Sequence, residues 1–153
     1  MTRGGAEVNE GIDSHNIPIG YEYTPLEFLV TPELNQQYLY AEEDFHRRYI
    51  EETKDGPPIV HPALLLNMSN DSRSPSFSSP PGVAGLHARD EAFFYNPARV
   101  GKRLRVTWKV IGAYEKRGRP YKIVECWVKD EDGQTIMKRL SHVTITVQQH
   151  SRE

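Results

Sequence analysis

The sequence predicts an α+β domain in which a curved antiparallel sheet wraps around one central helix. Residues 57–68, PPIVHPALLLNM, form the densest apolar run, and their apolar side chains would surround a helix on almost all sides. Such a pattern is typical of a buried helix. From Leu86 onward apolar and polar residues alternate, which indicates strands. The sheet needs one face covered, and the helix is the only segment able to cover it.

The composition indicates one domain of ordinary size. The chain has 153 residues, of which 37% are hydrophobic and 26% charged, and its net charge is −2. No block of like charge stands out, so we expect neither nucleic acid nor a membrane as a partner. The single cysteine, Cys126, excludes an internal disulfide, and the sequence shows neither a signal-peptide pattern nor an apolar run of membrane length. These features predict a cytoplasmic protein.

The first part of the chain predicts a tail, an extended segment and helix. Residues 1–20 are expected to form a flexible tail and residues 21–148 a single domain, which starts with a strand-like segment. Thr31-Pro32-Glu33 is a typical helix start, because Thr can cap the helix and Pro fits its first turn. The helix then continues either as one long helix or as two short ones with a turn at residues 41–44. Residues 55–58, DGPP, end it.

The second part predicts a long loop and four strands. The Ser- and Pro-rich residues 71–85 form the loop, and strands are expected at 86–95, 105–111, 121–128 and 134–147, joined as a meander. Apolar groups on both faces place residues 121–128 in the middle of the sheet. In the last strand Arg139 and Ser141 interrupt the inward apolar set, so we expect a bulge or bend near Leu140.

Three segments of the sequence resemble the MaoC-like hydratase/dehydratase family. AEEDFHRRY, residues 41–49, resembles the motif that carries a catalytic Asp and, five residues later, a catalytic His. PPIVHPALLLNM resembles the family's "IVHG" start of the central helix, and residues 86–110 resemble its first strand after the long loop. The resemblance covers residues 25–147 and points to the subgroup called FAS1-like dehydratases, the N-terminal hotdog type. It implies the hotdog fold, in which the curved sheet wraps the helix.

The resemblance also implies an acid–base site in which an Asp and a His hold a water molecule. Asp44 falls on the catalytic Asp, but Tyr49 stands where the family has its His. His46 and His61 are the other imidazole candidates, so these four residues are the candidate catalytic residues. Each also has a plain structural interpretation. Asp44 and His46 would be surface side chains, Tyr49 a packing aromatic, and His61 a buried side chain bonded to a loop carbonyl.

Substrate binding is implied at the start of the central helix and on one strand. Backbone N–H groups there hold the thioester oxygen in the family, which points to Pro62 and Ala63, although Pro62 has no N–H. His87 and Glu91 lie four residues apart on a predicted strand, so they should share a face. They would form a polar pair in the acyl tunnel or on a wet face. No metal-binding pattern occurs, and no cofactor is expected beyond the CoA or acyl carrier protein of the substrate.

Three functions agree with these features. The first is a lyase reaction, the reversible addition of water to a 2-enoyl thioester of CoA or acyl carrier protein. The second is a non-catalytic hotdog subunit that forms the acyl tunnel of a heteromeric hydratase, which the missing His at Tyr49 favours. The third is acyl-CoA thioesterase activity, for which Glu91 is the only carboxylate candidate. In each case we expect an acyl thioester as ligand and a homodimer, or a heterodimer with a second hotdog chain.

Overall fold

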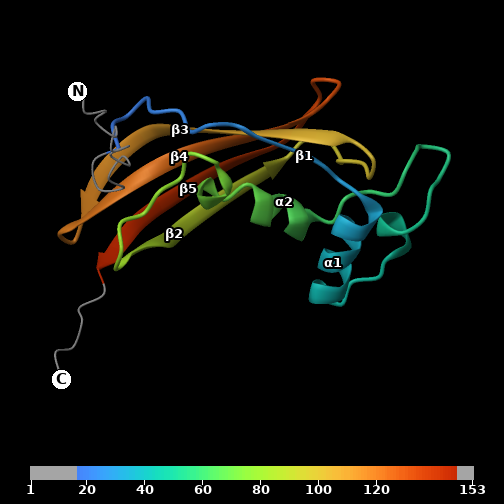
Figure 1. The fold of residues 1–153 in the computed structure, drawn as a ribbon, viewed down its shortest axis with the longest axis horizontal. Coiled ribbons are helices and arrows are strands. Elements are labelled where there is room, and N and C mark those ends of the chain that lie inside the picture. Colours follow the sequence, from blue (N-terminus) through green and yellow to red (C-terminus); the bar gives the residue numbers. More distant parts are fainter. Residues whose placement is uncertain (1–16, 148–153) are drawn as a thin grey trace, which may run out of the picture.

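A five-stranded antiparallel sheet curls around the short helix α2 (Figure 1). The structure, a computed structural model, describes residues 17–147. The strands are β1 (Leu26–Leu29), β2 (Val83–Phe94), β3 (Arg103–Lys116), β4 (Arg119–Asp130) and β5 (Thr135–Val147). The helices are α1 (Pro32–Glu42) and α2 (Pro62–Met68), and short 3-10 helices cover Arg47–Tyr49 and Asp71–Arg73. The predicted α+β class, with a curved antiparallel sheet around one central helix, is confirmed.

The strand order is β1-β3-β4-β5-β2, so β3, β4 and β5 form a meander while β2 lies at the edge beside β5. The predicted meander of four strands is therefore wrong for its first strand. Residues 95–102 carry the chain from β2 to β3. Within them the carbonyl of Ala98 accepts from Val60, and Val100 donates to the carbonyl of Pro58. These bonds hold the crossing against the segment that precedes α2, and β4 lies in the middle of the sheet as predicted.

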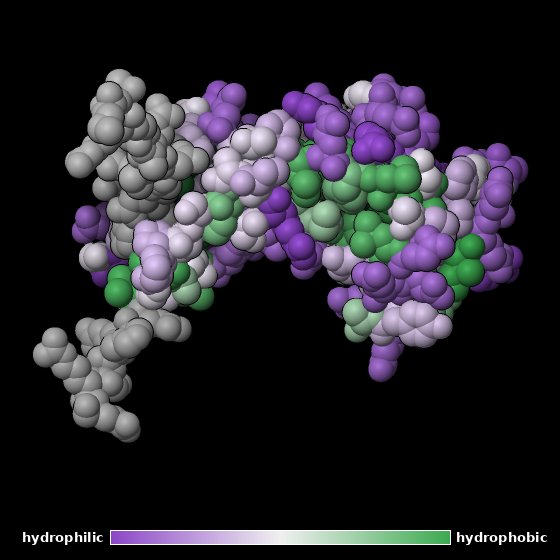
Figure 2. All heavy atoms as spheres, in the orientation of Figure 1, coloured by the Kyte–Doolittle hydropathy of each residue, from purple (hydrophilic) through white to green (hydrophobic). Residues whose placement is uncertain are grey.

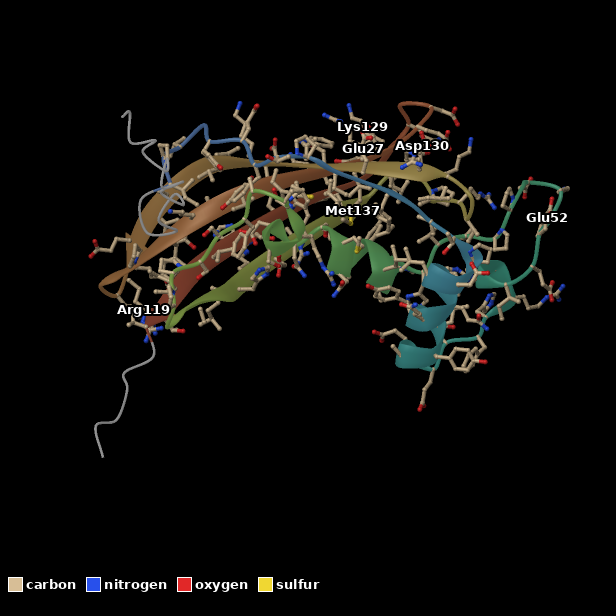
Figure 3. All side chains as sticks on the ribbon, viewed as in Figure 1. Glu27, Glu52, Arg119, Lys129, Asp130 and Met137 are labelled. Carbon is tan, nitrogen blue, oxygen red and sulfur yellow. The ribbon has the colours of Figure 1, made fainter. Side chains whose placement is uncertain are left out.

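One side of α2 covers the concave face of the sheet. Leu64 and Leu65 are buried there, and Trp108 of β3 donates from its indole nitrogen to the carbonyl of Ser69, 2.8 Å away. Figure 3 shows Met137 of β5 between the sheet and α2. The strand residues of this core are Leu104, Val106, Trp108, Val110, Val124, Cys126, Val128, Ile136 and Met137. Apolar burial along three strands thus fixes the position of the helix.

The other side of α2 reaches the surface, so the prediction of a helix buried almost all round is wrong there. Leu66 keeps 36% of its surface exposed, and Ala63 and Met68 are only partly buried. Figure 2 shows apolar atoms gathered over the part of the molecule where α2 lies. At the end of the edge strand, Phe93 and Phe94 are also exposed. The molecule therefore presents apolar surface beside its central helix.

The predicted helix start at Thr31 is confirmed. Its Oγ1 accepts a hydrogen bond from the N–H of Leu34 at 3.1 Å. α1 ends at Glu42 and a separate 3-10 turn follows, so the interpretation with two helical pieces is the correct one. Within residues 17–147, no helix is long and apolar enough to cross a membrane.

Part of the predicted tail lies on the sheet. The N–H of Gly20 donates to the carbonyl of Val110 at 2.7 Å, and Ile17 packs against the core. Residues 1–16 of that tail lie outside the described residues, as does residue 148 at the predicted end of the domain.

The inner face of β5 is polar in its middle, where Arg139 and Ser141 are 6% and 7% exposed. The predicted bulge near Leu140 is wrong, because the pairings of β5 with β2 and β4 run through Leu140 without a shift. One irregularity lies in β2, between His87 and Arg89, and another in the pairing of β4 with β5, which skips Ile136. The two polar residues of β5 therefore face inward because they have partners there, and no bulge at Leu140 is needed.

The guanidinium of Arg139 joins β5 to β2 and to the end of α2. Its Nε donates to Oδ1 of Asp90 at 2.9 Å, and its Nη1 donates to the carbonyl of Leu66 at 2.7 Å and to Oγ of Ser69 at 2.9 Å. Asp90 also accepts from the hydroxyl of Ser141 at 2.6 Å. A cation at a helix C-terminus satisfies carbonyl groups that lack partners within the helix. Arg139 thus anchors the C-terminal end of α2 to the sheet.

Arg139→Met is expected to lower the free energy of unfolding by about 3 kcal/mol, because it leaves Asp90 and the α2 carbonyl without their buried donor. Urea unfolding followed by tryptophan fluorescence measures the loss. Arg103→Met is the matched control, since Arg103 is exposed, and it should change the free energy by less than about 0.5 kcal/mol. Equal stability of the two variants would contradict the anchoring role.

Candidate active site

A tight turn directly after α1 positions Asp44. Glu43 has a left-handed φ of 52°, and the N–H of Asp44 bonds to the carbonyl of Leu39 at 3.0 Å. Oδ1 of Asp44 then accepts from the backbone N–H of His46 at 3.2 Å. Aspartate commonly stabilises turns by bonding to the backbone two residues further on. This bond leaves Oδ2 of Asp44 available to the start of α2.

His61 is the N-cap residue of α2, and its side chain forms two hydrogen bonds. Nδ1 accepts from the N–H of Ala63 at 3.0 Å, and Nε2 lies 3.1 Å from Oδ2 of Asp44. Because Nδ1 is an acceptor, the hydrogen of the neutral imidazole is on Nε2 and is donated to Asp44. The side chain of His61 is 11% exposed, whereas that of Asp44 is 42% exposed. The pair therefore combines a buried imidazole with a carboxylate that solvent reaches.

Asn35 of α1 holds together the two segments that carry this pair. Its Oδ1 accepts from the N–H of His61 at 2.9 Å, and its Nδ2 donates to the carbonyls of Tyr49 at 3.2 Å and Ile59 at 3.4 Å. Asn35 is only 1% exposed. It is not among the residues predicted from the sequence. The signal that points to it is its position four residues before Leu39, which places both side chains on the same face of α1.

The pKa of the Asp44 carboxyl lies below its ordinary value. The hydrogen bond from the backbone N–H of His46 is the largest cause, and the hydrogen bond and charge of His61 lower the pKa further. Loss of solvation acts in the opposite direction without cancelling these effects. The carboxyl group is therefore ionised at neutral pH, as the acceptor role in both hydrogen bonds requires.

The side chains of Tyr49 and His46 lie beside the pair and form no hydrogen bond with Asp44 or the His61 ring. The ring of Tyr49 packs against the ring of His61, with 4.8 Å between centroids. Nδ1 of His46 accepts from the backbone N–H of Arg48 at 3.2 Å and from its Nε at 3.1 Å. Of the predicted catalytic residues, the structure thus brings together Asp44 and His61. Tyr49 fits its interpretation as a packing aromatic.

The N–H groups at the start of α2 are already used within the protein. Pro62 has none, the N–H of Ala63 donates to His61, and that of Leu64 donates to the carbonyl of His61 at 3.1 Å. The oxyanion donors implied for Pro62 and Ala63 are therefore not free in this arrangement. An apolar hollow of about 280 Å³ lies beside the helix start, with Pro62, Leu65 and Phe94 in its wall.

His87 and Glu91, the other predicted binding residues, lie on β2, away from the Asp44–His61 pair. The irregularity in β2 inserts one extra residue after His87 and so reverses the alternation of side chains beyond it. The ring of His87 therefore contacts Asp90, whereas Glu91 forms an ion pair with Arg89. The prediction that His87 and Glu91 share a face is therefore wrong. Nδ1 of His87 lies 3.3 Å from Oδ2 of Asp90. Among residues 17–147, no three His, Cys, Asp or Glu side chains are grouped as a metal site requires.

Several solved structures share this architecture. R-hydratase PhaJ1 from Pseudomonas aeruginosa superposes with a TM-score of 0.69 at 13% identity, over 90% of each chain. A MaoC-like dehydratase from Rhodospirillum rubrum superposes with a TM-score of 0.68 at 15% identity, over 89% of this chain and 97% of its own. The protein has the hotdog fold. The resemblance predicted from the sequence is thus confirmed at the level of the fold.

One hotdog neighbour is part of an assembly of two different chains. A chain of the ChsH1-ChsH2 complex from Mycobacterium tuberculosis superposes on this hotdog chain with a TM-score of 0.61, at 10% identity over 84% of this chain and 98% of its own. No protein-family profile and no curated protein matches the sequence. At these identities the likeness concerns the fold, and the activity has to be argued from the Asp44–His61 pair.

In a pH titration followed by carboxyl NMR, Asp44 is expected to titrate below about 3.9, the ordinary pKa of Asp. A carboxyl whose pKa is lowered by folding stabilises the folded state above its ordinary pKa, and this contribution is lost as the pH falls through the lowered pKa. The stability difference between the wild type and Asp44→Asn should therefore be constant above about pH 5 and change below about pH 4.

His61→Leu is the companion variant for this titration. It removes one of the hydrogen-bond donors to Asp44 and should raise the midpoint of the Asp44 titration. The larger lowering of the Asp44 pKa by the backbone N–H of His46 should remain. A wild-type midpoint above about 3.9 would contradict the described turn and pair.

Proposed function

We propose that the protein is a hydratase/dehydratase that adds water reversibly to 2-enoyl thioesters of CoA or acyl carrier protein. The observation that carries this proposal is the contact between Asp44 and His61 at the start of the central helix, between residues 17 positions apart. The R-hydratase and the MaoC-like dehydratase that share the fold support it. A carboxylate beside an imidazole is an arrangement suited to acid–base chemistry, and the residue after His61, Pro62, lines an apolar hollow.

In the proposed reaction the carboxylate of Asp44 transfers the proton, and the imidazole of His61 holds that carboxylate in position. The ionised carboxylate takes a proton from water while the water oxygen bonds to C3 of the enoyl group. The resulting carboxylic acid returns that proton to C2, so that H and OH have been added across the double bond. Nε2–H of His61 orients the carboxylate through its hydrogen bond, since this nitrogen already carries a hydrogen and cannot act as the base.

The exposed side of Asp44 and the hollow beside α2 define where the substrate would lie. The apolar wall with Leu65 and Phe94 suits the acyl part of the substrate. The thioester oxygen would reach the N–H of Ala63 only after His61 releases it, because His61 occupies that donor in the structure. Release of this bond is therefore part of the proposed substrate binding.

The occupied N–H of Ala63 also favours a second candidate, a non-catalytic hotdog subunit of a heteromeric hydratase. In that case the chain shapes an acyl tunnel and a second hotdog chain supplies the acid–base pair. Edge strand β2, with Leu86 47% exposed and Phe93 44% exposed, offers apolar surface for a homodimer or heterodimer. The two-chain complex among the structural neighbours supports such an assembly. Thioester hydrolysis finds less support, because Glu91 pairs with Arg89 and the carboxylate at the start of α2 is that of Asp44.

The purified chain is expected to remove the enoyl absorbance of crotonyl-CoA, and Asp44→Asn should lower kcat/KM by about 100-fold or more, because it removes the proton-transfer group. His61→Gln should lower kcat/KM less, since a donor to the carboxylate can remain. Asp55→Asn is the control: Asp55 is an exposed carboxylate in the loop before α2, and its loss should leave the rate unchanged.

Two outcomes decide between the candidates. Activity that Asp44→Asn leaves intact would contradict the role given to Asp44. No activity alone, combined with activity after a second hotdog chain is added and no effect of Asp44→Asn on that activity, would replace the lyase by the non-catalytic subunit.

A further inference from the structure

A larger cavity of about 630 Å³ lies on the concave side of the sheet beyond the end of α2. Strands β2, β4 and β5 supply Val83, Val124 and Val143 to its wall, and the loop after α2 supplies Phe77. This volume lies in the range of about 300–1,000 Å³ that is usual for small-molecule sites, which are mostly apolar with a few polar groups.

The cavity is separate from the Asp44–His61 pair. It shares no lining residue with the hollow beside Pro62, and its residues Asp71 and Ser72 follow α2 whereas His61 precedes it. A helix of this length spans roughly 10 Å. Figure 3 shows Arg119, next to Pro120 of the cavity wall, at the opposite end of the molecule from Glu52 in the loop before α2.

An oriented imidazole forms part of the cavity wall. His87 lines the cavity and its Nδ1 contacts Oδ2 of Asp90, whose other oxygen accepts from Arg139 and Ser141. Although burial raises the pKa of Asp90, these hydrogen bonds outweigh it and the pKa is lowered. Asp90 is therefore an ionised acceptor, so Nδ1 of neutral His87 carries the hydrogen. Nε2 is left as an acceptor, and no group in residues 17–147 bonds to it.

A carboxyl group without a cationic partner lies in the same wall. Within the described part of the chain, no side chain donates a hydrogen bond to Asp71 and no ion pair includes it. Burial raises its pKa, and the charge of a protonated His87, the backbone N–H of Ser72 and the charge of Arg139 only partly offset this. A desolvated carboxylate of this kind is stabilised by any cation that binds beside it.

Aromatic side chains complete the surroundings. Tyr23 and Phe77 stack with 6.5 Å between ring centroids, and Tyr114 and Tyr121 stack with 5.0 Å between theirs. All four line the cavity. Aromatic faces attract ammonium groups, most strongly where water is excluded. Lys122 and Glu115 are the other charged residues of the wall, and Lys122 is not among the main influences on the pKa of Asp71.

We propose that this cavity binds a small apolar amine, with its ammonium group between the carboxylate of Asp71 and Nε2 of His87. Two neighbouring acceptors need a ligand with at least two donors, and a primary ammonium has three. A hydroxyl group has only one donor hydrogen, and a ligand carboxylate would be repelled by the carboxylate of Asp71. The apolar part of the amine would lie against the valines of β2, β4 and β5. The proposal does not depend on the thioester reaction.

The test compares three probes with the same chain and different head groups: n-octylammonium, 1-octanol and octanoate. Isothermal titration of the full chain, without any thioester, is expected to show octylammonium binding at least tenfold more tightly than octanol and no binding of octanoate. Asp71→Asn should reduce the affinity for octylammonium to the affinity that the wild type has for octanol. Asp55→Asn, a carboxylate outside the cavity, should leave it unchanged.

Val143→Trp fills the cavity from β5 and should abolish binding of all probes. Because this variant has a structural cost, Asp71→Asn, which removes only a desolvated charge, remains the decisive change. Equal affinities for octylammonium and octanol, preference for octanoate, or unchanged octylammonium binding in Asp71→Asn would each overturn the proposal.

Discussion

The imidazole of His61 forms two hydrogen bonds, and each fixes a different part of the molecule. Nδ1 caps α2 by accepting from Ala63, and Nε2 donates to Asp44 in the loop after α1. The cap sets the tautomer, and the tautomer makes His61 a donor to the carboxylate. From this one arrangement follow the orientation of the Asp44 carboxylate, its proposed role as the proton-transfer group, and the absence of a free Ala63 N–H for a thioester oxygen.

This arrangement depends on a helix that cannot hold itself in place. α2 has 7 residues, whereas isolated helices shorter than about 12 are marginal in water. Buried polar side chains fix it at both ends, Asn35 at the N–H of His61 and Arg139 at the carbonyl of Leu66. Between them the hydroxyl of Tyr38 donates to Asn67 at 3.0 Å. The Arg139 end also holds Asp90 and, through it, His87 in the second cavity. Each end of the helix is thus joined to a different site.

The sequence predicts those features that depend on local patterns. The apolar run 57–68, the alternation of the strands and the capping Thr31 indicated the fold correctly, because they reflect burial and backbone geometry within short segments. The position of β2 was not predictable, since a long loop does not specify which edge it reaches. The roles of Asn35 and Arg139 were not predicted, because a buried polar residue is recognised only by its partner. The partner of Asn35 is His61, 26 residues away, and the partner of Arg139 is Asp90, 49 residues away. Asp44 and His61 were among the residues predicted from the sequence, but only the structure shows that they, and not Asp44 and Tyr49, form the hydrogen-bonded pair.

The state of the His61 ring tests the account most directly. In the protein with ¹⁵N-labelled histidine, NMR at neutral pH is expected to show hydrogen on Nε2 and an unprotonated Nδ1 that accepts from Ala63. The N–H of Ala63 should then exchange slowly with solvent, and His61→Leu should make it exchange fast. A ring with hydrogen on Nδ1, or a rapidly exchanging Ala63 N–H in the wild type, would contradict the account, because His61 would then neither cap α2 nor donate to Asp44 through Nε2.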